Sequence, residues 1–379
     1  MSPMSNDNAQ SDVAELQATL ARAGSPWVAG ATTMSQLSDA EKHLRLGYVP
    51  GPGEPTLEAR EQLATAQYAE LGAAGIRAVG APAVYDLRNV GGKNFISPIV
   101  DQGNCGSCVS FGACATVEGT ARVTRNDPNF VIDMSEAHLF YCHARTQGRR
   151  CGGANGGWWV PPALDAFKNI GVADEACYPY AASDQDCTNL CTDWQNRVTK
   201  IKSWTALSAA PDMKTWLSTK GPLAACFTVY DDFFDYRSGV YRHVSGAFAG
   251  GHCISVVGYD DNQQCWICKN SWGSGWGETG YFRIQYGQVG IDQTMWGVEV
   301  AAPLPDTNWY NNTRITGLWA NPQERNAWAY LDTIGWRRIA PDSEAIYLSL
   351  LTLLATAKGT NCPVNVHLEG GLIKEVYVL

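Results

Sequence analysis

Two segments of the chain contain side chains that could perform an acyl transfer. The first runs from Asp101 to Cys108 with the sequence Asp-Gln-Gly-Asn-Cys-Gly-Ser-Cys. The second contains Gly251-His252 and, further on, the stretch from Lys269 to Gly277. Together they supply a thiol nucleophile, an imidazole base, an amide to orient that base and an amide donor for an oxyanion. These are the parts of a cysteine acyl-transfer site.

Cys108 is predicted to lie at the start of a helix. Residues 103–107 form a turn-rich loop and residues 109–118 are apolar at helical spacing, so a helix is expected to begin near Ser107. The thiolate is the reactive form of cysteine, and a helix N-terminus beside a protonated histidine lowers the pKa of a thiol. This position therefore suits a nucleophile.

The composition excludes several classes of protein. The chain has 379 residues, of which 45% are hydrophobic and 17% charged, so we expect a globular protein of two domains, or of one domain with extensions. Its formal net charge of −9 argues against a nucleic-acid partner, which requires clustered Lys and Arg. The sequence has no apolar run of about 18 residues, so no membrane span is expected. Residues 1–10 are polar and show no signal peptide.

Three regions follow one another along the chain. Residues 1–80 favour helices. A flexible linker at 72–82 connects them to the next region. Residues 81–303 have helical stretches first and strand-like stretches later, which predicts an α+β domain. Residues 304–379 follow a boundary signal at Pro303-Leu-Pro305. The expected helices are 12–23, one beginning at Ser38, 56–74 and 343–358. The expected strands are 223–230, 253–259, 265–269, 280–285, 315–320, 327–330, 336–339, 364–368 and 373–379.

Three separated motifs resemble those of one protein family. They are Gln-Gly-x-Cys-Gly-Ser-Cys at 102–108, Gly-His at 251–252, and Asn-Ser-Trp-Gly-x-Gly-Trp-Gly-x-x-Gly-Tyr-Phe at 270–282. In this order they resemble the motifs of the papain-like cysteine peptidases. The resemblance covers roughly residues 83–303. It implies a two-lobed papain-like fold with a helical lobe and a β-barrel-like lobe, preceded by a helical prosegment and followed by a small β-rich module.

The resemblance also implies a role for each site residue. Cys108 would attack a peptide carbonyl to give a thioester acyl-enzyme, and His252 would act as acid and base. Asn270 would orient the imidazole, and Trp272 would cover that contact. Gln102 and the Cys108 backbone N–H would stabilise the oxyanion. The expected activity is cysteine endopeptidase, acting on a polypeptide substrate, because no paired histidines of an occluding loop are evident. Val109 departs from the family, which normally has Trp there.

Substrate would lie along a glycine-rich wall. Asn155-Gly156-Gly157-Trp158-Trp159 resembles the family's wall, where bare backbone lets an extended peptide add strand-like hydrogen bonds. Trp159 and Thr294 would contribute to the main specificity pocket. The alternative is simple packing of two tryptophans.

Thirteen cysteines leave at least one without an intrachain partner. By resemblance Cys105 pairs with Cys151, and Cys142 pairs with Cys177. A short local bridge between Cys187 and Cys191 is a further hypothesis. Disulfides would imply a secreted protein or another oxidising compartment. Cys265-Trp-Ile-Cys268 matches a redox or zinc motif, but in a strand these two positions face opposite sides, so we expect no metal and no cofactor.

The flanking regions leave alternatives open. The leader resembles an inhibitory prosegment that lies through the cleft of a zymogen; the alternative is a simple helical cap. For the whole chain, an inactive papain-like binding protein and an acyl-transferring peptide ligase are the other candidates. In the C-terminal module, four tryptophans form either a carbohydrate- or protein-binding face or a core, and a small barrel such as an OB-fold is allowed. They are Trp309, Trp319, Trp328 and Trp336.

Overall fold

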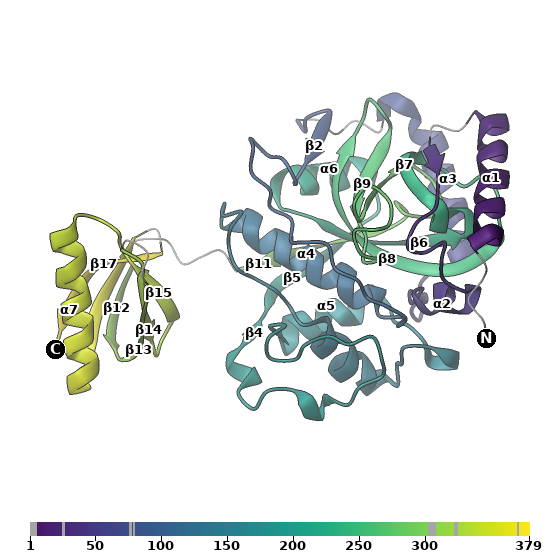
Figure 1. The fold of residues 1–379 in the computed structure, drawn as a ribbon. Helices are drawn as coiled ribbons and strands as arrows, with labels where there is room; N and C mark the ends of the chain where they lie inside the picture. The colour runs from purple at the N-terminus through teal and green to yellow at the C-terminus, as the bar shows by residue number, and fades with distance from the viewer. Residues whose placement is uncertain are drawn as a thin grey trace. The chain divides into compact units, whose positions relative to one another are not determined.

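The computed structural model describes residues 6–24, 27–75, 78, 80–301, 308–321, 325–369 and 371–379. The chain forms two compact units, Met1–Ala301 and Ala302–Leu379 (Figure 1). The expected boundary at Pro303 to Pro305 lies outside the described residues, as do residues 76, 77 and 79 of the expected linker. Within the described ranges, no helix is long and apolar enough to cross a bilayer.

The first unit combines a helical lobe with a strand-rich lobe, which confirms the α+β papain-like class. Its long sheet has the strand order β1-β7-β10-β9-β8-β6-β11-β5, and β2 pairs with β8. The strands of the unit are β1 (Trp27–Ala29), β2 (Val84–Asp86), β3 (Val172–Ala173), β4 (Val198–Thr199), β5 (Ile201–Leu207), β6 (Leu223–Tyr230), β7 (Tyr236–Tyr241), β8 (Phe248–Asp260), β9 (Cys265–Lys269), β10 (Tyr281–Gln285) and β11 (Met295–Val300).

The helices of this unit are α1 (Asn6–Ala23), α2 (Asp39–Leu44), α3 (Leu57–Gly75), α4 (Cys108–Thr124), α5 (Val160–Asn169) and α6 (Ala210–Thr219). Helix α4 lies between α5 on one side and β8 and β11 on the other, so it joins the two lobes (Figure 1). Its residues are almost all buried. Two hydrophobic cores result, one inside the strand lobe and one around α4 and α5. Cys108 and His252 therefore both stand on buried elements, α4 and β8.

The N-terminal segment packs on the strand lobe. Strand β1 adds to β7 in antiparallel register, and the Trp27 indole donates to the Arg242 carbonyl at 2.9 Å. Ser38 forms a capping box with Glu41 at the start of α2, which explains why the helix begins there. The helices expected over 12–23, from Ser38 and over 56–74 correspond to α1, α2 and α3.

The second unit is a six-stranded sheet with one helix. Its elements are β12 (Asn308–Thr313), β13 (Ile315–Ala320), β14 (Ala327–Leu331), β15 (Gly335–Ile339), α7 (Glu344–Thr360), β16 (Val364–Glu369) and β17 (Leu372–Val378). The strand order is β12-β16-β17-β15-β14-β13. Only Arg314 separates β12 from β13, so the two form one bent strand. Because β12 and β13 stand at the two ends of the strand order, this bent strand connects both edges of the sheet. The apolar faces of α7 and the strands enclose a separate core.

Three disulfides lie in the helical lobe, and two expected pairings are wrong. Cys105 is bonded to Cys151, as expected. Cys142 is bonded to Cys187, and Cys177 to Cys191, so neither the Cys142–Cys177 bridge nor a local Cys187–Cys191 bridge forms. The physical reason is the path of the later loop. The Cys191 N–H donates to the Cys177 carbonyl at 3.2 Å, which places these two residues side by side.

Candidate active site

Cys108 is the first residue of α4, as the sequence predicted. Its side chain is fully buried in the core around that helix. Backbone N–H groups of Cys253, Gly47 and Val109 act to lower the pKa of its thiol, against the larger opposite effect of burial. Val109, which replaces the aromatic residue of the resemblance, is also fully buried. The structure thus places the thiol at a helix N-terminus, where the helix dipole favours the thiolate.

His252 and Asn270 meet because β8 and β9 form an antiparallel pair, with Ser255 opposite Lys269. His252 Nε2 lies 2.7 Å from Asn270 Oδ1. The same Oδ1 accepts the Ser271 N–H at 2.8 Å, which fixes the amide orientation, so the imidazole must donate from Nε2. In a neutral ring Nδ1 is then the basic nitrogen, and it is buried without a hydrogen-bond partner.

Trp272 covers the contact between His252 and Asn270. Its ring centroid lies 4.6 Å from that of His252, at an interplanar angle of 32°. Phe227, the partner of His252 across β6 and β8, closes a further side with its edge, at 5.9 Å. Trp272 and His252 are both almost fully buried. Water is therefore kept from the hydrogen bond that orients the imidazole.

Gln102 is connected to this same corner of the site. Its backbone N–H donates to the Ser271 carbonyl at 2.9 Å, and its Oε1 accepts the Ser271 hydroxyl at 2.7 Å. With Oε1 held, the Nε2 donor is directed to the Cys105 carbonyl at 2.8 Å and the Arg45 carbonyl at 3.0 Å. Gln102, Ser271, Asn270 and His252 are thus joined by hydrogen bonds, and Cys108 lies in the same buried cluster as Cys253, the neighbour of His252. The donor of Gln102 is already occupied by the N-terminal segment.

Residues 45–49 lie along the site between the two lobes. The Tyr48 N–H donates to the Gly251 carbonyl at 3.0 Å, and the Trp158 N–H donates to the Gly47 carbonyl at 2.8 Å. The Val49 N–H returns to the Trp158 carbonyl at 3.0 Å. A Cβ on Gly47 would lie only 1.9 Å from the Gly106 carbonyl oxygen, so only glycine fits there. The segment is therefore held on both sides by main-chain hydrogen bonds.

Tyr48 fills the space beside Cys108. Its side chain is buried and packs with Cys108, Cys226 and Cys253 in one core cluster. The Tyr48 hydroxyl donates to Glu54 Oε2 at 3.0 Å, and the buried Arg60 guanidinium lies 5.5 Å from its ring. Sequence analysis did not single out this stretch. The only available signal was Gly47 between larger residues, which marks a close backbone approach.

The glycine-rich wall has two distinct tryptophans. The Trp158 side chain is fully buried and donates to Gln147 Oε1 at 3.0 Å, so its backbone alone faces the segment at 47–49. Gly157 has φ +77° and carries its bare backbone against the Gly47 carbonyl. Trp159 is half-buried, and Gly51 lies directly against its ring. Thr294, expected beside Trp159, precedes β11 and donates to Gln293 Oε1 at 2.9 Å.

Burial sets the charge state of the closed site. It raises the pKa of the Cys108 thiol above its ordinary value, and the neighbouring Cys253 thiol adds to that effect. It lowers the pKa of His252 to about 4, against a smaller opposing effect of the Asn270 hydrogen bond. Burial therefore disfavours charge on both the thiol and the imidazole in the closed site.

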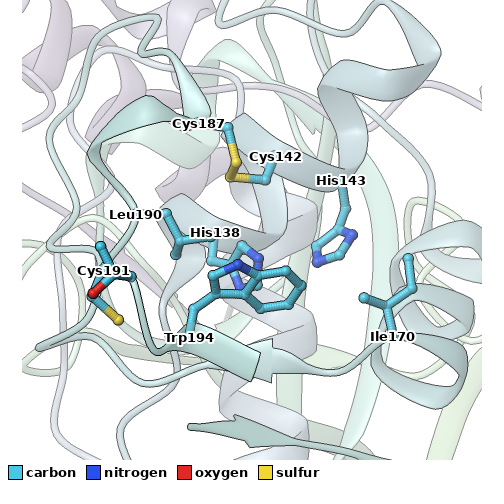
Figure 2. Close-up of a pocket in the computed structure, with 9 residues that line it drawn as sticks. His138, Cys142, His143, Ile170, Cys187, Leu190, Cys191 and Trp194 are labelled. Carbon is cyan, nitrogen blue, oxygen red and sulfur yellow. A yellow bond between two sulfur atoms is a disulfide. The ribbon is translucent and has the colours of Figure 1, made fainter. Parts of the chain in front are cut away.

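A separate pocket of about 500 Å³ in the helical lobe contains none of these residues (Figure 2). It is lined in part by His138, His143, Trp194 and the Cys142–Cys187 disulfide. His138 Nδ1 accepts the Ala173 N–H at 2.9 Å, and burial lowers the pKa of His138 to about 3. These histidines are neutral packing groups.

Cys265 and Cys268, the two cysteines of the possible metal motif, are buried, unbonded thiols of β9.

The fold and this site together define a papain-like protein, and comparison with known proteins agrees. Residues 81–299 match the family described as "Papain family cysteine protease". The chain is 35% identical over 234 residues to "Cathepsin B-like CP3" of Giardia intestinalis, covering 59% of this chain and 76% of that protein. It is 36% identical over 199 residues to "Cathepsin B-like CP2" of the same organism, covering 50% and 64%.

Among solved structures, the fold is similar to "proCathepsin B S9 from Trypanosoma congolense". The TM-score is 0.59 at 24% identity, and the match covers 77% of this chain and 98% of that one. Because the family match spans more than half of the chain, the protein belongs to the papain family of cysteine proteases.

Proposed function

We propose that the chain is the zymogen of a cysteine endopeptidase in which Cys108 is the nucleophile. The observation that supports this most directly is the hydrogen-bonded series His252–Asn270–Ser271–Gln102, whose Gln102 also bonds to Arg45 of the segment at residues 45–49. Cys108 is buried in the cluster that contains Tyr48 of that segment and Cys253. Each of the proposed catalytic residues has the chemistry that its role requires. Residues 45–49 precede the matched family region, which begins at residue 81.

The proposed reaction uses these groups in sequence. His252 Nδ1 takes the Cys108 proton, and the thiolate attacks a peptide carbonyl to form a thioester while His252 protonates the leaving amine. Water then hydrolyses the thioester. Asn270 keeps the imidazole oriented through the 2.7 Å hydrogen bond. Gln102 Nε2 stabilises the oxyanion, a contribution of about 3 kcal/mol for one such donor.

Inhibition by the prosegment follows from the same contacts. Backbone atoms of residues 47–49 hydrogen-bond to Gly251 and Trp158, which are the groups that an extended substrate would use. Arg45 Nη1 lies 2.6 Å from Asp101 Oδ1 and its Nε donates to Asn104 Oδ1 at 3.1 Å, which fixes the segment beside the Gln102 loop. The segment leaves no path for substrate to Cys108, so removal of the prosegment is the activating step.

The disulfides bear on the compartment. Three disulfides are present in the helical lobe. Such bonds persist in oxidising environments, so we propose that the protein matures in a secretory or otherwise oxidising compartment.

The test compares one protein before and after cleavage of its prosegment. A site for a specific protease is introduced at residues 80–82, which are exposed or half-buried. Hydrolysis of a fluorogenic peptide is then measured with the intact and the cleaved chain, with Cys108→Ala as the control. We expect activity only after cleavage and none in the control. Equal activity of the intact and cleaved chains would show that the segment is a helical cap and not an inhibitor.

A further inference from the structure

The second unit has an aromatic outer surface that the peptidase chemistry does not use. Along β14, Ala327, Ala329 and Leu331 are buried in the core, whereas Trp328 and Tyr330 between them point outward. This alternation is the ordinary period of a strand with one buried face. The expected OB-like barrel stays a proposal, which the strand order supports. Its interior is filled by the apolar residues, so the tryptophans are not core.

Strand register gathers the outward rings into one surface. Trp319 of β13 lies opposite Trp328, and Tyr330 lies opposite Trp336 of β15. The Tyr330 and Trp336 rings meet edge to face with centroids 5.4 Å apart. Gly317 lies opposite Tyr330, and a Cβ on Gly317 would lie 3.0 Å from the Trp336 ring. The absence of a side chain at Gly317 therefore leaves room for the Trp336 ring. We call these four rings the aromatic face.

The aromatic face contains a shallow pocket with a fixed ring in its wall. The pocket has a volume of about 590 Å³ and is lined by Trp319, Asn326, Trp328 and Trp336. Asn326 Oδ1 accepts the Trp328 indole N–H at 3.0 Å, and Asn326 Nδ2 donates to Asn321 Oδ1 at 3.1 Å. The Trp328 ring is therefore held in place before any ligand arrives. Among the described residues, no side chain that lines the pocket is ionisable.

The exposure of these rings distinguishes the second unit from the first. Trp319 is 49% exposed and Trp336 is 45% exposed. Among the described residues, the strongly exposed aromatic side chains of the second unit are Trp309, Trp319, Tyr330, Trp336 and Tyr377, whereas the larger first unit has only Phe248. Soluble proteins rarely expose such clustered apolar surface without a binding role.

Charge narrows the class of ligand. Residues 302–379 contain six Lys and Arg and seven Asp and Glu, a net charge of −1. Register places one cation on the aromatic face, Arg338 opposite Trp328, and its guanidinium donates to the Arg325 carbonyl. Single-stranded nucleic acid also stacks on aromatic rings, but its phosphates need a positively charged groove. A peptide would need donors for its carbonyls, and of the three indole N–H groups in the pocket, that of Trp328 is already used by Asn326. An uncharged ligand with flat apolar faces and hydroxyl edges fits the remaining chemistry.

We propose that the aromatic face of the C-terminal module binds a neutral oligosaccharide. The sugar rings stack on Trp319, Trp336 and the fixed Trp328, and their hydroxyls hydrogen-bond at the Asn326 edge of the pocket. Mostly apolar walls with a few placed polar groups are the usual composition of a small-ligand site. The module then attaches the peptidase to glycan-bearing material. Binding is independent of the peptidase assignment, because no residue of the first unit takes part.

The test uses the full chain with Cys108→Ser, which prevents self-cleavage. Cellohexaose, chitohexaose and mannohexaose are titrated by calorimetry against this protein and against three further variants, Trp319→Ala, Trp336→Ala and Trp309→Ala. Trp309 is the matched control, since it is an exposed tryptophan stacked on His367 and lies outside the pocket. We expect at least one hexasaccharide to bind. Loss of either pocket tryptophan should weaken its Kd by about tenfold or more, and loss of Trp309 by less than about twofold.

Three results would overturn the proposal. One is no binding of any hexasaccharide at millimolar concentration. A second is an equal loss of affinity in Trp309→Ala and Trp319→Ala. The third is tighter binding of oligo-dT or of a proline-rich peptide than of every sugar, which would assign the aromatic face to another class of ligand. Melting curves of the variants exclude unfolding as the cause, since the substituted rings are exposed. Failure here leaves the peptidase assay unaffected.

Discussion

Gln102 donates its side-chain N–H to the main-chain carbonyl of Arg45, over 3.0 Å. Arg45 belongs to the prosegment, so the donor proposed for the oxyanion is occupied by a carbonyl oxygen of the inhibitor. At the same time the His252–Asn270 hydrogen bond is already formed at 2.7 Å. Under the proposed function, the precursor has a largely assembled site that is blocked by its own chain. Activation would then require removal of residues 45–49 and not a rebuilding of the site.

Replacing Gln102 with Ala tests the oxyanion role. In the cleaved enzyme we expect kcat to fall by about 10²–10³ with little change in KM, because the donor acts on charge that develops in the transition state. Ser271→Ala removes only the 2.7 Å hydrogen bond that holds Gln102 and should cost less, about tenfold. Steady-state kinetics on a peptide substrate measure both. An unchanged kcat in Gln102→Ala would remove this residue from the mechanism.

Replacing Gly47 with Ala tests how closely residues 45–49 pack against the backbone at Gly106. The added Cβ would lie 1.9 Å from the Gly106 carbonyl oxygen, so residues 45–49 must leave their position. We expect the precursor to expose Cys108 and to be alkylated by iodoacetamide at least about tenfold faster, since a loss of about 1.4 kcal/mol gives such a factor. Gly359→Ala is the control, because no atom lies within 4 Å of its added Cβ. Identical labelling rates in both variants would contradict the blocked cleft.

Acid should loosen the closed form. Burial lowers the pKa of His252 to about 4, whereas an exposed imidazole titrates near 6.5. The closed form binds fewer protons than the open form between these values, so its stability falls as the pH drops from about 6.5 to about 4. The loss is on the order of 3 kcal/mol.

Hydrogen exchange of the Tyr48 and Val49 amides measures this opening, because both are hydrogen-bonded across the cleft. In the Cys108→Ser precursor, protection corrected for intrinsic exchange should decrease over that pH range. In the same precursor with His252→Gln it should depend much less on pH. Equal pH dependence in both proteins would show that another group controls opening.

Arg45 should contribute modestly to holding the prosegment. Its guanidinium lies 2.6 Å from Asp101, a half-exposed carboxylate, so the ion pair is worth less than about 1 kcal/mol. Arg45→Ala should raise the alkylation rate of Cys108 in the precursor by about two- to fivefold, with a smaller effect at high salt. Arg22→Ala is matched to it, since the exposed Arg22 donates to Thr19 within α1 at 3.2 Å. A larger effect of Arg22→Ala would contradict the assigned contacts.

The sequence predicted those features whose signals are local. Cys108 at the start of α4 followed from a turn-rich loop before an apolar helical pattern, and β6 and β9 were predicted with their observed bounds. Their cause is strict periodicity between clear breakers. The same local reasoning placed Ser38 at the beginning of α2, where its hydroxyl accepts the Glu41 N–H.

Features that depend on distant chain segments were not predictable in this way. The Cys142–Cys187 and Cys177–Cys191 bonds depend on how one loop lies over the helical lobe, and spacing does not record that path. The fit of Gly47 against Gly106 depends on two segments far apart in sequence. The outward direction of Trp319 and Trp336 depends on strand register. A lone glycine or tryptophan does not specify its partner.

The most direct test of the central claim is covalent labelling of the cleaved protein. A thiol-directed peptidyl inhibitor is added to the prosegment-free enzyme and to the intact precursor, and the adduct is mapped by mass spectrometry. We predict one adduct on Cys108, complete loss of proteolysis in the cleaved enzyme, and little labelling of the precursor. Labelling of a different cysteine, or proteolysis that persists without labelling of Cys108, would contradict the account.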